Sequence, residues 1–261
     1  MRVLTAFTQG KGVSPNLDRL VATDAWVAVI DGVTPKSDEM AGAIAATARL
    51  VDDMVVAIEN ADPGLDPFDL VDTLTDITAT HQGRHRPSAA GAVFSLAARR
   101  VVVVTDTWVA VDGSAQFYGH RYEEHVTGIR RALTDRELAA GRSVDDLRRD
   151  DPGRVAIGDL LVRESGLMNV DGQGDYFYAA WNGLPIPRHL LTSVEVPLDA
   201  RELILATDGY PVLAPTWEET ELALQRELAD DPLRIGPYGG PKALAPGADS
   251  FDDRSFVLVE L

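Results

Sequence analysis

Aspartates stand at the ends of four apolar stretches that have the length and composition of buried strands. Asp31 follows AWVAVI, Asp106 follows VVVVT, Asp208 follows LILAT, and Asp252 comes shortly before SFVLVEL. Taken singly, each is most simply a turn residue, because aspartate bonds its own backbone and Asp-Gly pairs tolerate positive φ. As a group they indicate a binding site, since side chains at strand ends are held rigidly.

If these carboxylates meet, the chemistry they favour is the binding of divalent cations. Neighbouring buried carboxylates repel one another unless protons or cations neutralise them. The chain has no cysteine, and its histidines offer no helical His-x-x-x-His pair; His120 and His125 are expected in exposed loops or edges. A set of oxygen ligands selects hard cations, Mg²⁺ or Mn²⁺, at water-rich octahedral sites.

The charge balance excludes two classes of partner. With 24 basic and 41 acidic residues, the formal net charge is −17. Such a surface repels phosphate backbones and anionic lipid headgroups, so we expect neither a nucleic-acid partner nor a membrane partner. The segment MRVLTAFTQGKG lacks the apolar core of a secretory signal, and no apolar run approaches the ~20 residues that cross a bilayer. The expected location is the cytoplasm.

The elements that must position the aspartates are strands separated mostly by short turns. Apolar runs predict strands in several segments, including the alternating aromatic DYFYAAWN at 175–182. Helical spacing predicts helices over 37–60, capped by Ser37, and over 66–82, packed together on one sheet. Residues 128–168 are helix-prone and highly charged. Because short turns join antiparallel neighbours, the pattern favours an α+β layered domain over a doubly wound parallel sheet.

The order and context of these blocks resemble the metal-dependent serine/threonine phosphatases of the protein phosphatase 2C family. PNLDR…AWVAVIDGVT (15–34) is similar to the family's Asn-Glu-Asp opening and the strand that ends in Asp-Gly. SAAGAVFSLAARRVVVVTDTWVAV (88–111) resembles its Ser/Thr-Ala motif, hairpin and Gly-Asp-Ser motif, with Thr105-Asp106-Thr107 in the last place. LILATDGYPVL and DDRSFVLVEL are similar to its last two acidic blocks. DYFYAAWNG suggests a divergent bacterial branch.

The resemblance implies a fold and an extent for the domain. The four blocks occur in the family's order and span nearly the whole chain. The implied fold is a single domain over 1–261, a four-layer α-β-β-α sandwich of two mainly antiparallel sheets flanked by helices. Residues 128–168 would form a helical or flap region near the site.

The resemblance also implies roles for individual residues around two or three Mg²⁺ or Mn²⁺ ions. Asp31 would bridge two metals, with the Gly32 carbonyl on the second. Asp208 and Asp252 would bind the first metal. Asp106 would help Asp208 to hold a third, weaker metal, and Asp18 would orient metal-bound waters without touching the metals. The catalytic residues implied are therefore Asp31, Asp208 and Asp18.

The chain departs from the family pattern at residues that bind the substrate phosphate in that family. Val13 stands where the family has an arginine, and Leu17 replaces the glutamate of the Asn-Glu-Asp block. Lys11 is the nearest candidate to bind the phosphate, although a lysine lacks the bidentate fork of arginine. An arginine from residues 128–163 is the other candidate.

Two functions follow from these observations, and a third hypothesis, an unrelated enzyme or binding protein whose Asp turns are coincidental, stays open. The first is a metal-dependent phosphohydrolase that uses metal-activated water to dephosphorylate phosphoserine or phosphothreonine in a phosphoprotein, or another small phosphate ester. The alternative is a catalytically weak or inactive relative that acts as a metal-binding regulatory or interaction module. The missing phosphate-binding arginine favours the alternative, and retention of the acidic residues favours the enzyme.

Overall fold

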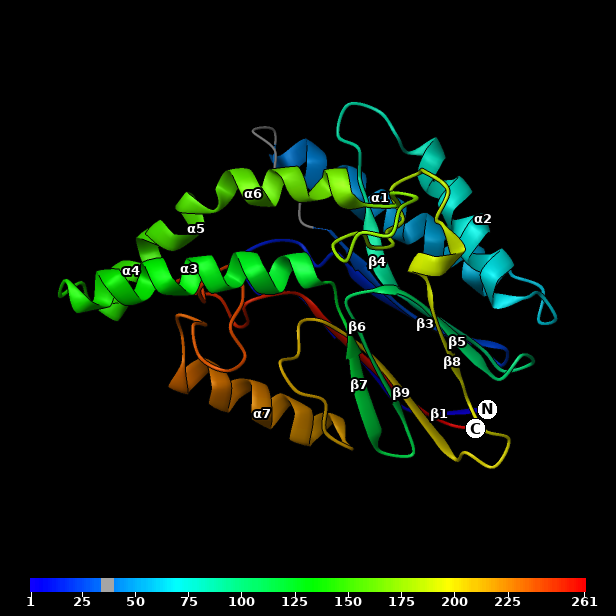
Figure 1. The fold of residues 1–261 in the computed structure, drawn as a ribbon. Coiled ribbons are helices and arrows are strands. Elements are labelled where there is room, and N and C mark those ends of the chain that lie inside the picture. Colours follow the sequence, from blue (N-terminus) through cyan, green and yellow to red (C-terminus); the bar gives the residue numbers. More distant parts are fainter. Residues whose placement is uncertain (34–39) are drawn as a thin grey trace.

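The computed structural model describes residues 1–33 and 40–261, so the expected Ser37 cap and the first residues of the predicted helix 37–60 lie outside it. The described chain forms two five-stranded sheets whose strand pairs are all antiparallel (Figure 1). One sheet has the order β1 (Arg2–Gln9), β10 (Arg254–Glu260), β9 (Glu202–Thr207), β6 (Thr107–Val111) and β7 (Ser114–Tyr118). The other has the order β2 (Asp18–Ala22), β3 (Trp26–Gly32), β4 (Ala89–Ser95), β5 (Arg100–Thr105) and β8 (Thr192–Glu195).

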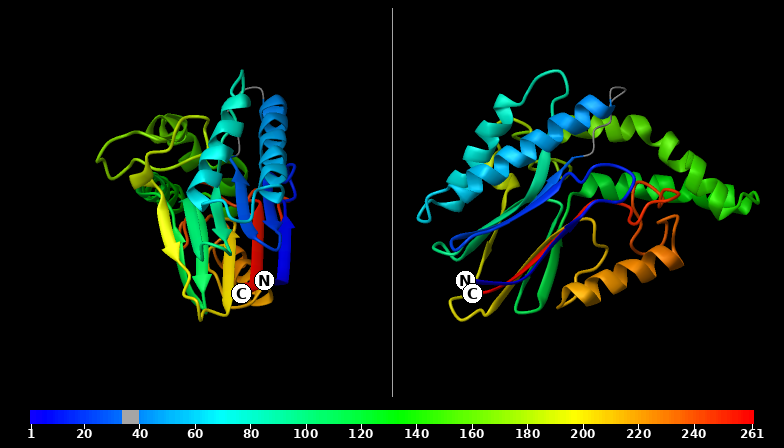
Figure 2. Two further views of the ribbon diagram at one scale, coloured as in Figure 1. Left: turned by 90° about the vertical axis from the view of Figure 1, so that its right-hand side faces the viewer. Right: turned by 180° about the vertical axis from the view of Figure 1, so that it is seen from behind.

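Helices cover the outer faces of both sheets and extend past one end of the sandwich (Figures 1 and 2). They are α1 (Met40–Glu59), α2 (Pro67–Thr80), α3 (Arg121–Ala139), α4 (Val144–Asp150), α5 (Pro152–Ala156), α6 (Gly158–Arg163) and α7 (Trp217–Asp230), with short 3₁₀ turns η1 (Glu164–Leu167) and η2 (Arg188–Leu190). The cap of α2 follows from local sequence, because Asp66 accepts a hydrogen bond from the Phe68 N–H at 2.8 Å and Pro67 occupies the first turn.

Apolar side chains fill three layers of core. Alternation along β3 places Val27 and Val29 between the sheets, and places Trp26 and Ile30 against α1 and α2. On the far side, Leu224 of α7 packs against the outer face of the first sheet, within a cluster of buried residues from β6, β9 and β10. The predicted α+β four-layer α-β-β-α sandwich is therefore confirmed, as is the packing of the first two helices together on one sheet.

The predicted helix-prone region is mostly helical between residues 121 and 167, with breaks after α3 and between the shorter helices, and it begins earlier than expected. Helices α3 to α6 leave the end of the sandwich and run beside one another in Figure 1. Arg130 of α3 is fully buried, and its guanidinium binds Asp151 at 2.8 Å and the carbonyl of Leu233 at 2.9 Å. A buried guanidinium needs acceptors for its N–H groups, and these bonds tie α3 to the α4–α5 junction and to the loop after α7.

The prediction of a strand at 175–182 was wrong. This segment forms only isolated bridges among the described residues, Tyr178 with Met168 and Trp181 with Ala89. Its aromatic alternation instead reflects packing. Trp181 is fully buried against α2 and donates its indole N–H to the Val71 carbonyl at 3.3 Å. Alternation of this kind fits a half-buried strand and a loop pinned by its aromatic residues equally well.

In the described part of the chain, no helix combines the length and the apolar character that a membrane crossing requires.

Candidate metal centre and active site

The predicted aspartates come from both sheets and meet at one end of the sandwich. Asp18 begins β2 and lies opposite Asp31, near the end of β3, in the register of the second sheet. Asp208 follows β9 and Asp252 precedes β10 in the first sheet, while Asp106 is the single residue between β5 and β6, where the chain passes from one sheet to the other. All of these except Asp18 line one cavity of about 690 Å³.

The crossing at Asp106 requires an unusual backbone. Thr105 has a φ of 117° and Asp106 a φ of 48°, both outside the regions that L-residues ordinarily occupy. Opposite Thr105, the register of β4 and β5 shifts next to Gly91. A β-branched threonine with positive φ is strained and persists only where the surroundings fix it. This strained conformation carries the chain from one sheet to the other and places Asp106 at the cavity wall.

The Asp-Gly pairs that begin at Asp31 and Asp208 allow the close approach of chain segments and do not use a positive φ. Neither Gly32 nor Gly209 is among the residues with positive φ. A Cβ at Gly209 would lie 2.2 Å from the Asp253 carbonyl oxygen, and one at Gly32 would lie 2.8 Å from the Leu17 carbonyl oxygen. Each glycine therefore lets another loop of the site pass directly over a strand end. The interpretation of Asp-Gly as a turn did not predict this close approach.

The carboxylates around the cavity carry negative charge that the described residues leave largely unbalanced. Burial, followed by the charges of neighbouring acids, raises the pKa of Asp31 and Asp208 well above the ordinary aspartate value. The pKa of Asp106 is raised to about 7, first by burial and then by Glu164. One oxygen of Asp208, Oδ1, is buried with no hydrogen-bond partner among the described residues. A hard divalent cation fits these oxygens, because it would neutralise charges that otherwise repel.

Asp18 lies behind the cavity in a network that joins the two sheets. Its Oδ2 accepts a hydrogen bond from the Thr207 hydroxyl at 2.6 Å, and the Thr207 Oγ1 accepts one from the Ser255 N–H at 2.9 Å. Burial raises the pKa of Asp18 to about 7, against the lowering effect of the Thr207 hydrogen bond. The carboxyl is therefore fixed in position while its charge state can change near neutral pH.

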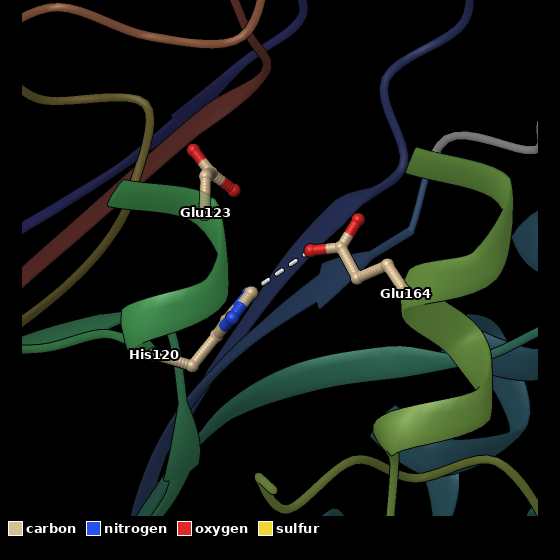
Figure 3. Close-up of side chains that lie close together, drawn as sticks. All are labelled: His120, Glu123 and Glu164. Carbon is tan, nitrogen blue, oxygen red and sulfur yellow. Dashed lines mark ion pairs between the residues drawn. The ribbon is translucent and has the colours of Figure 1, made fainter. Parts of the chain in front are cut away.

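A second group of side chains that could hold a metal ion lies at the same cavity and was not predicted. His120 precedes α3, Glu123 is in the first turn of α3, and Glu164 begins η1; one ligand atom from each lies within 4.8 Å of the others (Figure 3). The His120 Nε2 is 3.3 Å from Glu164 Oε1 and 3.6 Å from Asp106 Oδ2. The pKa of Glu123 is raised to about 7, first by burial and then by the charge of Asp106.

The expectation that His120 is exposed was wrong. Its exposed fraction is 9%, and its ring stacks on Tyr178 with 4.1 Å between ring centroids, whereas His125 is exposed as expected. The one signal in the sequence was the spacing of His120 and Glu123, since residues three apart at a helix start lie on the same side. Nothing in the spacing indicates Glu164, which the fold brings from another helix.

Asp252 differs from the other acids because lysines pair with both of its oxygens. Lys11 Nζ lies 2.8 Å from Oδ1, and Lys242 Nζ lies 2.5 Å from Oδ2. Burial opposes ionisation of Asp252, but Lys242 and Lys11 outweigh it and lower the pKa to about 2. A divalent cation fits this carboxylate poorly, since it would have to sit beside two ammonium groups.

Positively charged side chains at the cavity wall are the candidates to bind the substrate phosphate. Lys11 lines the cavity, but it is 8% exposed and bonded to Asp252, while Val13 is exposed and lines the same cavity. Arg154 of α5, within the region considered as an alternative, also lines the cavity, and its Nη1 donates to the Pro241 carbonyl at 3.0 Å. The structure thus brings both kinds of candidate to the cavity.

Comparison with known proteins connects this fold to solved phosphatases. No protein-family model matches the chain, and no curated protein matches it in sequence. The structure is similar to serine/threonine phosphatase Stp1 from Staphylococcus aureus, with a TM-score of 0.50, 14% identity, and coverage of 98% of this chain and 94% of that one. It also matches the Mycobacterium tuberculosis serine/threonine phosphatase PstP/Ppp, with a TM-score of 0.49, 16% identity and 99% of both chains covered.

A further solved structure, the catalytic domain of PstP in complex with two manganese ions, matches with a TM-score of 0.49, 17% identity and full coverage of both chains. The resemblance to the protein phosphatase 2C family is therefore confirmed at the level of the fold.

Proposed function

We propose that this chain is a metal-dependent phosphohydrolase that resembles protein phosphatase 2C and removes phosphate from phosphoserine or phosphothreonine in a phosphoprotein, or from another phosphate ester. One observation supports this proposal above the others. Partly buried carboxylates from both sheets line one cavity of about 690 Å³, and burial, followed by the charges of neighbouring acids, raises the pKa values of Asp31, Asp208 and Asp106. Buried acids with raised pKa values in a cavity are typical of functional sites.

In this proposal Asp31, the Gly32 carbonyl, Asp208 and Asp106 hold two or three divalent cations, Mg²⁺ or Mn²⁺. Such cations would supply a water of lowered pKa and would offset the charge of the phosphoryl oxygens. The His120, Glu123 and Glu164 group adds an imidazole to the ligands near Asp106, and imidazole suits Mn²⁺ better than Mg²⁺.

The chain's own residues have three tasks in this reaction. Asp18, held by Thr207, would orient water and exchange a proton at its Oδ1 near neutral pH. Arg154 and Lys11, which both line the cavity, would attract the substrate phosphate. We favour Arg154 as the direct contact, because a guanidinium can bind two phosphate oxygens at once and Lys11 is already paired with Asp252.

Hydrolysis of p-nitrophenyl phosphate and of a phosphothreonine peptide with Mn²⁺ tests this function. Asp208→Asn should lower kcat/KM by about 100-fold or more, since metal ions supply several kcal/mol of transition-state stabilisation. Asp24→Asn removes an exposed carboxylate at the β2–β3 turn and is the matched control, with unchanged activity expected. A wild-type protein that binds Mn²⁺ but hydrolyses neither substrate would contradict the proposal.

The second candidate function is a metal-binding regulatory or interaction module with little or no activity. Two observations favour it: Val13 stands in the place of the expected arginine, and Asp252 is neutralised by Lys11 and Lys242. It predicts a melting temperature that rises with Mn²⁺ while both substrates remain intact. The lack of nucleic-acid and membrane partners stays a prediction from the charge of the chain, and the cytoplasmic location stays a prediction from the sequence alone.

A further inference from the structure

The carboxylate of Asp252 accepts three hydrogen bonds, and two of the donors are positively charged. Lys11 Nζ donates to Oδ1 at 2.8 Å, Lys242 Nζ donates to Oδ2 at 2.5 Å, and the Asp253 N–H donates to Oδ1 at 3.0 Å. Lys11 Nζ also lies 3.8 Å from Asp253 Oδ1. Two ammonium groups carry together the charge of one divalent cation, and here they lie on both oxygens of one carboxylate.

Both lysines are held in place by the segments that carry them. The Lys11 N–H donates to Asp253 Oδ1 at 3.0 Å, and the Leu17 N–H donates to Asp253 Oδ2 at 2.9 Å, so the loop after β1 is fixed to the start of β10. The side chain of Lys11 is 10% exposed. Because these backbone hydrogen bonds hold both segments, the Lys11–Asp252 ion pair differs from an ion pair between two mobile side chains at the surface.

Hydrogen bonds made by both neighbouring residues hold the segment that carries Lys242. The Pro241 carbonyl accepts a hydrogen bond from Arg154 Nη1 at 3.0 Å, and the Ala243 N–H donates to Asp151 Oδ2 at 3.0 Å. These bonds tie the loop before β10 to α5. Lys242 therefore reaches the cavity from a loop held by the same helical region that supplies Glu164.

Asp31 and Asp208, which line the same cavity, lack this neutralisation. Among the described residues, no lysine or arginine forms an ion pair with Asp31 or Asp208. The cavity thus has one end neutralised by the chain itself and one end that requires a cation from solution.

We propose that the ammonium groups of Lys11 and Lys242 occupy the place of one divalent cation at Asp252. Metal ions then bind on the side of Asp31, Asp208 and Asp106. The number of ions per chain is therefore one fewer than it would be if Asp252 also bound a divalent cation. This inference rests on the proposed function, because it requires that divalent cations bind at the rest of the cavity.

Mn²⁺ binding by the whole chain tests the inference, with calorimetric titration for affinity and electron paramagnetic resonance for the number of ions. Asp208→Asn should weaken Mn²⁺ binding by about tenfold or more. Asp252→Asn should leave the number of ions unchanged and should weaken Mn²⁺ binding far less than Asp208→Asn does, because its carboxylate is committed to the lysines. The asparagine side chain has nearly the same shape, so this variant tests the inference even if changes at the lysines prevent folding.

The complementary variant removes both ammonium groups. Lys11→Met together with Lys242→Met should gain one Mn²⁺ ion per chain, since a buried Asp252 would then require a cation. Adding Asp252→Asn should abolish the extra ion. Arg100→Met is the control, because it frees the exposed Glu195 from its ion pair and should create no tight site.

The outcomes separate the inference from the proposed function. If Asp252→Asn removes an ion or weakens Mn²⁺ binding as strongly as Asp208→Asn, the lysines do not replace a metal and only the inference is overturned. If the wild type takes up no Mn²⁺ at millimolar concentration, the metal-dependent function fails, and the inference fails with it. A number of ions that Asp252→Asn leaves unchanged, with an extra ion in the double lysine variant, supports the inference and the metal binding on which it rests.

Discussion

Replacing Asp18 with asparagine should stabilise the metal-free protein more at pH 8 than at pH 5. Burial raises the pKa of Asp18 to about 7 in the folded state, against 3.8 for the free group. An acid with a raised folded pKa contributes stability below its unfolded pKa, and that contribution is lost as the pH rises through the folded pKa. The metal-free wild type should therefore lose stability from about pH 4 to just above pH 7, and asparagine avoids this loss.

The magnitude follows from the interval over which the proton is lost. Between pH 5 and the folded pKa lie about two pH units, each worth ~1.4 kcal/mol, so the advantage of asparagine should grow by at most about 3 kcal/mol between pH 5 and pH 8. For a chain of this size that corresponds to roughly 5–10 °C in melting temperature. Disturbance of the Thr207 hydrogen bond affects both pH values alike, so the difference between them isolates the charge.

Thermal unfolding in a chelator at both pH values measures this effect. Asp24→Asn, at an exposed position, is the control and should show no change with pH relative to the wild type. With saturating Mn²⁺ at pH 8 the advantage of Asp18→Asn should shrink, because a cation would relieve the same repulsion. If Asp18→Asn shifts the melting temperature equally at pH 5 and pH 8, the carboxyl ionises normally in the folded protein and the reasoning is refuted.

Three further predictions concern the site and the core. His120→Ala should weaken Mn²⁺ affinity by about tenfold in calorimetric titration, and an unchanged affinity would remove the imidazole from the ligand set. Gly209→Ala should lower the melting temperature strongly, because its Cβ would lie 2.2 Å from a carbonyl oxygen, whereas Gly128→Ala meets open space on α3 and should be neutral or stabilising by up to about 1 kcal/mol. Trp181→Ala should reduce the free energy of unfolding in urea by about 3–5 kcal/mol, since this side chain is fully buried, and a loss below about 1 kcal/mol would contradict its place in the core.

Local pattern was sufficient to find most of the sandwich and its acidic strand ends. The runs before Asp31 and Asp208 form buried strands, and the helical spacing after residue 37 corresponds to α1 in its described part. These elements were predictable because burial on a sheet or a helix imposes a period that neighbouring residues in the sequence record. The layer order came from the resemblance to a known family, since periodicity does not specify which sheets stack.

The chemistry around Asp252 and His120 was decided only by tertiary structure. Lys11 and Lys242 pair with one carboxylate from loops at opposite ends of the chain, and Glu164 reaches His120 from a separate helical segment. Charged side chains in loops follow no period, so their partners depend on how the loops pack over the strand ends. The sequence by itself determined that carboxylates would gather at the ends of buried strands. Which of them remain available to a cation was decided by packing, because a buried charge is neutralised by whichever opposite charge the fold brings within a few ångströms.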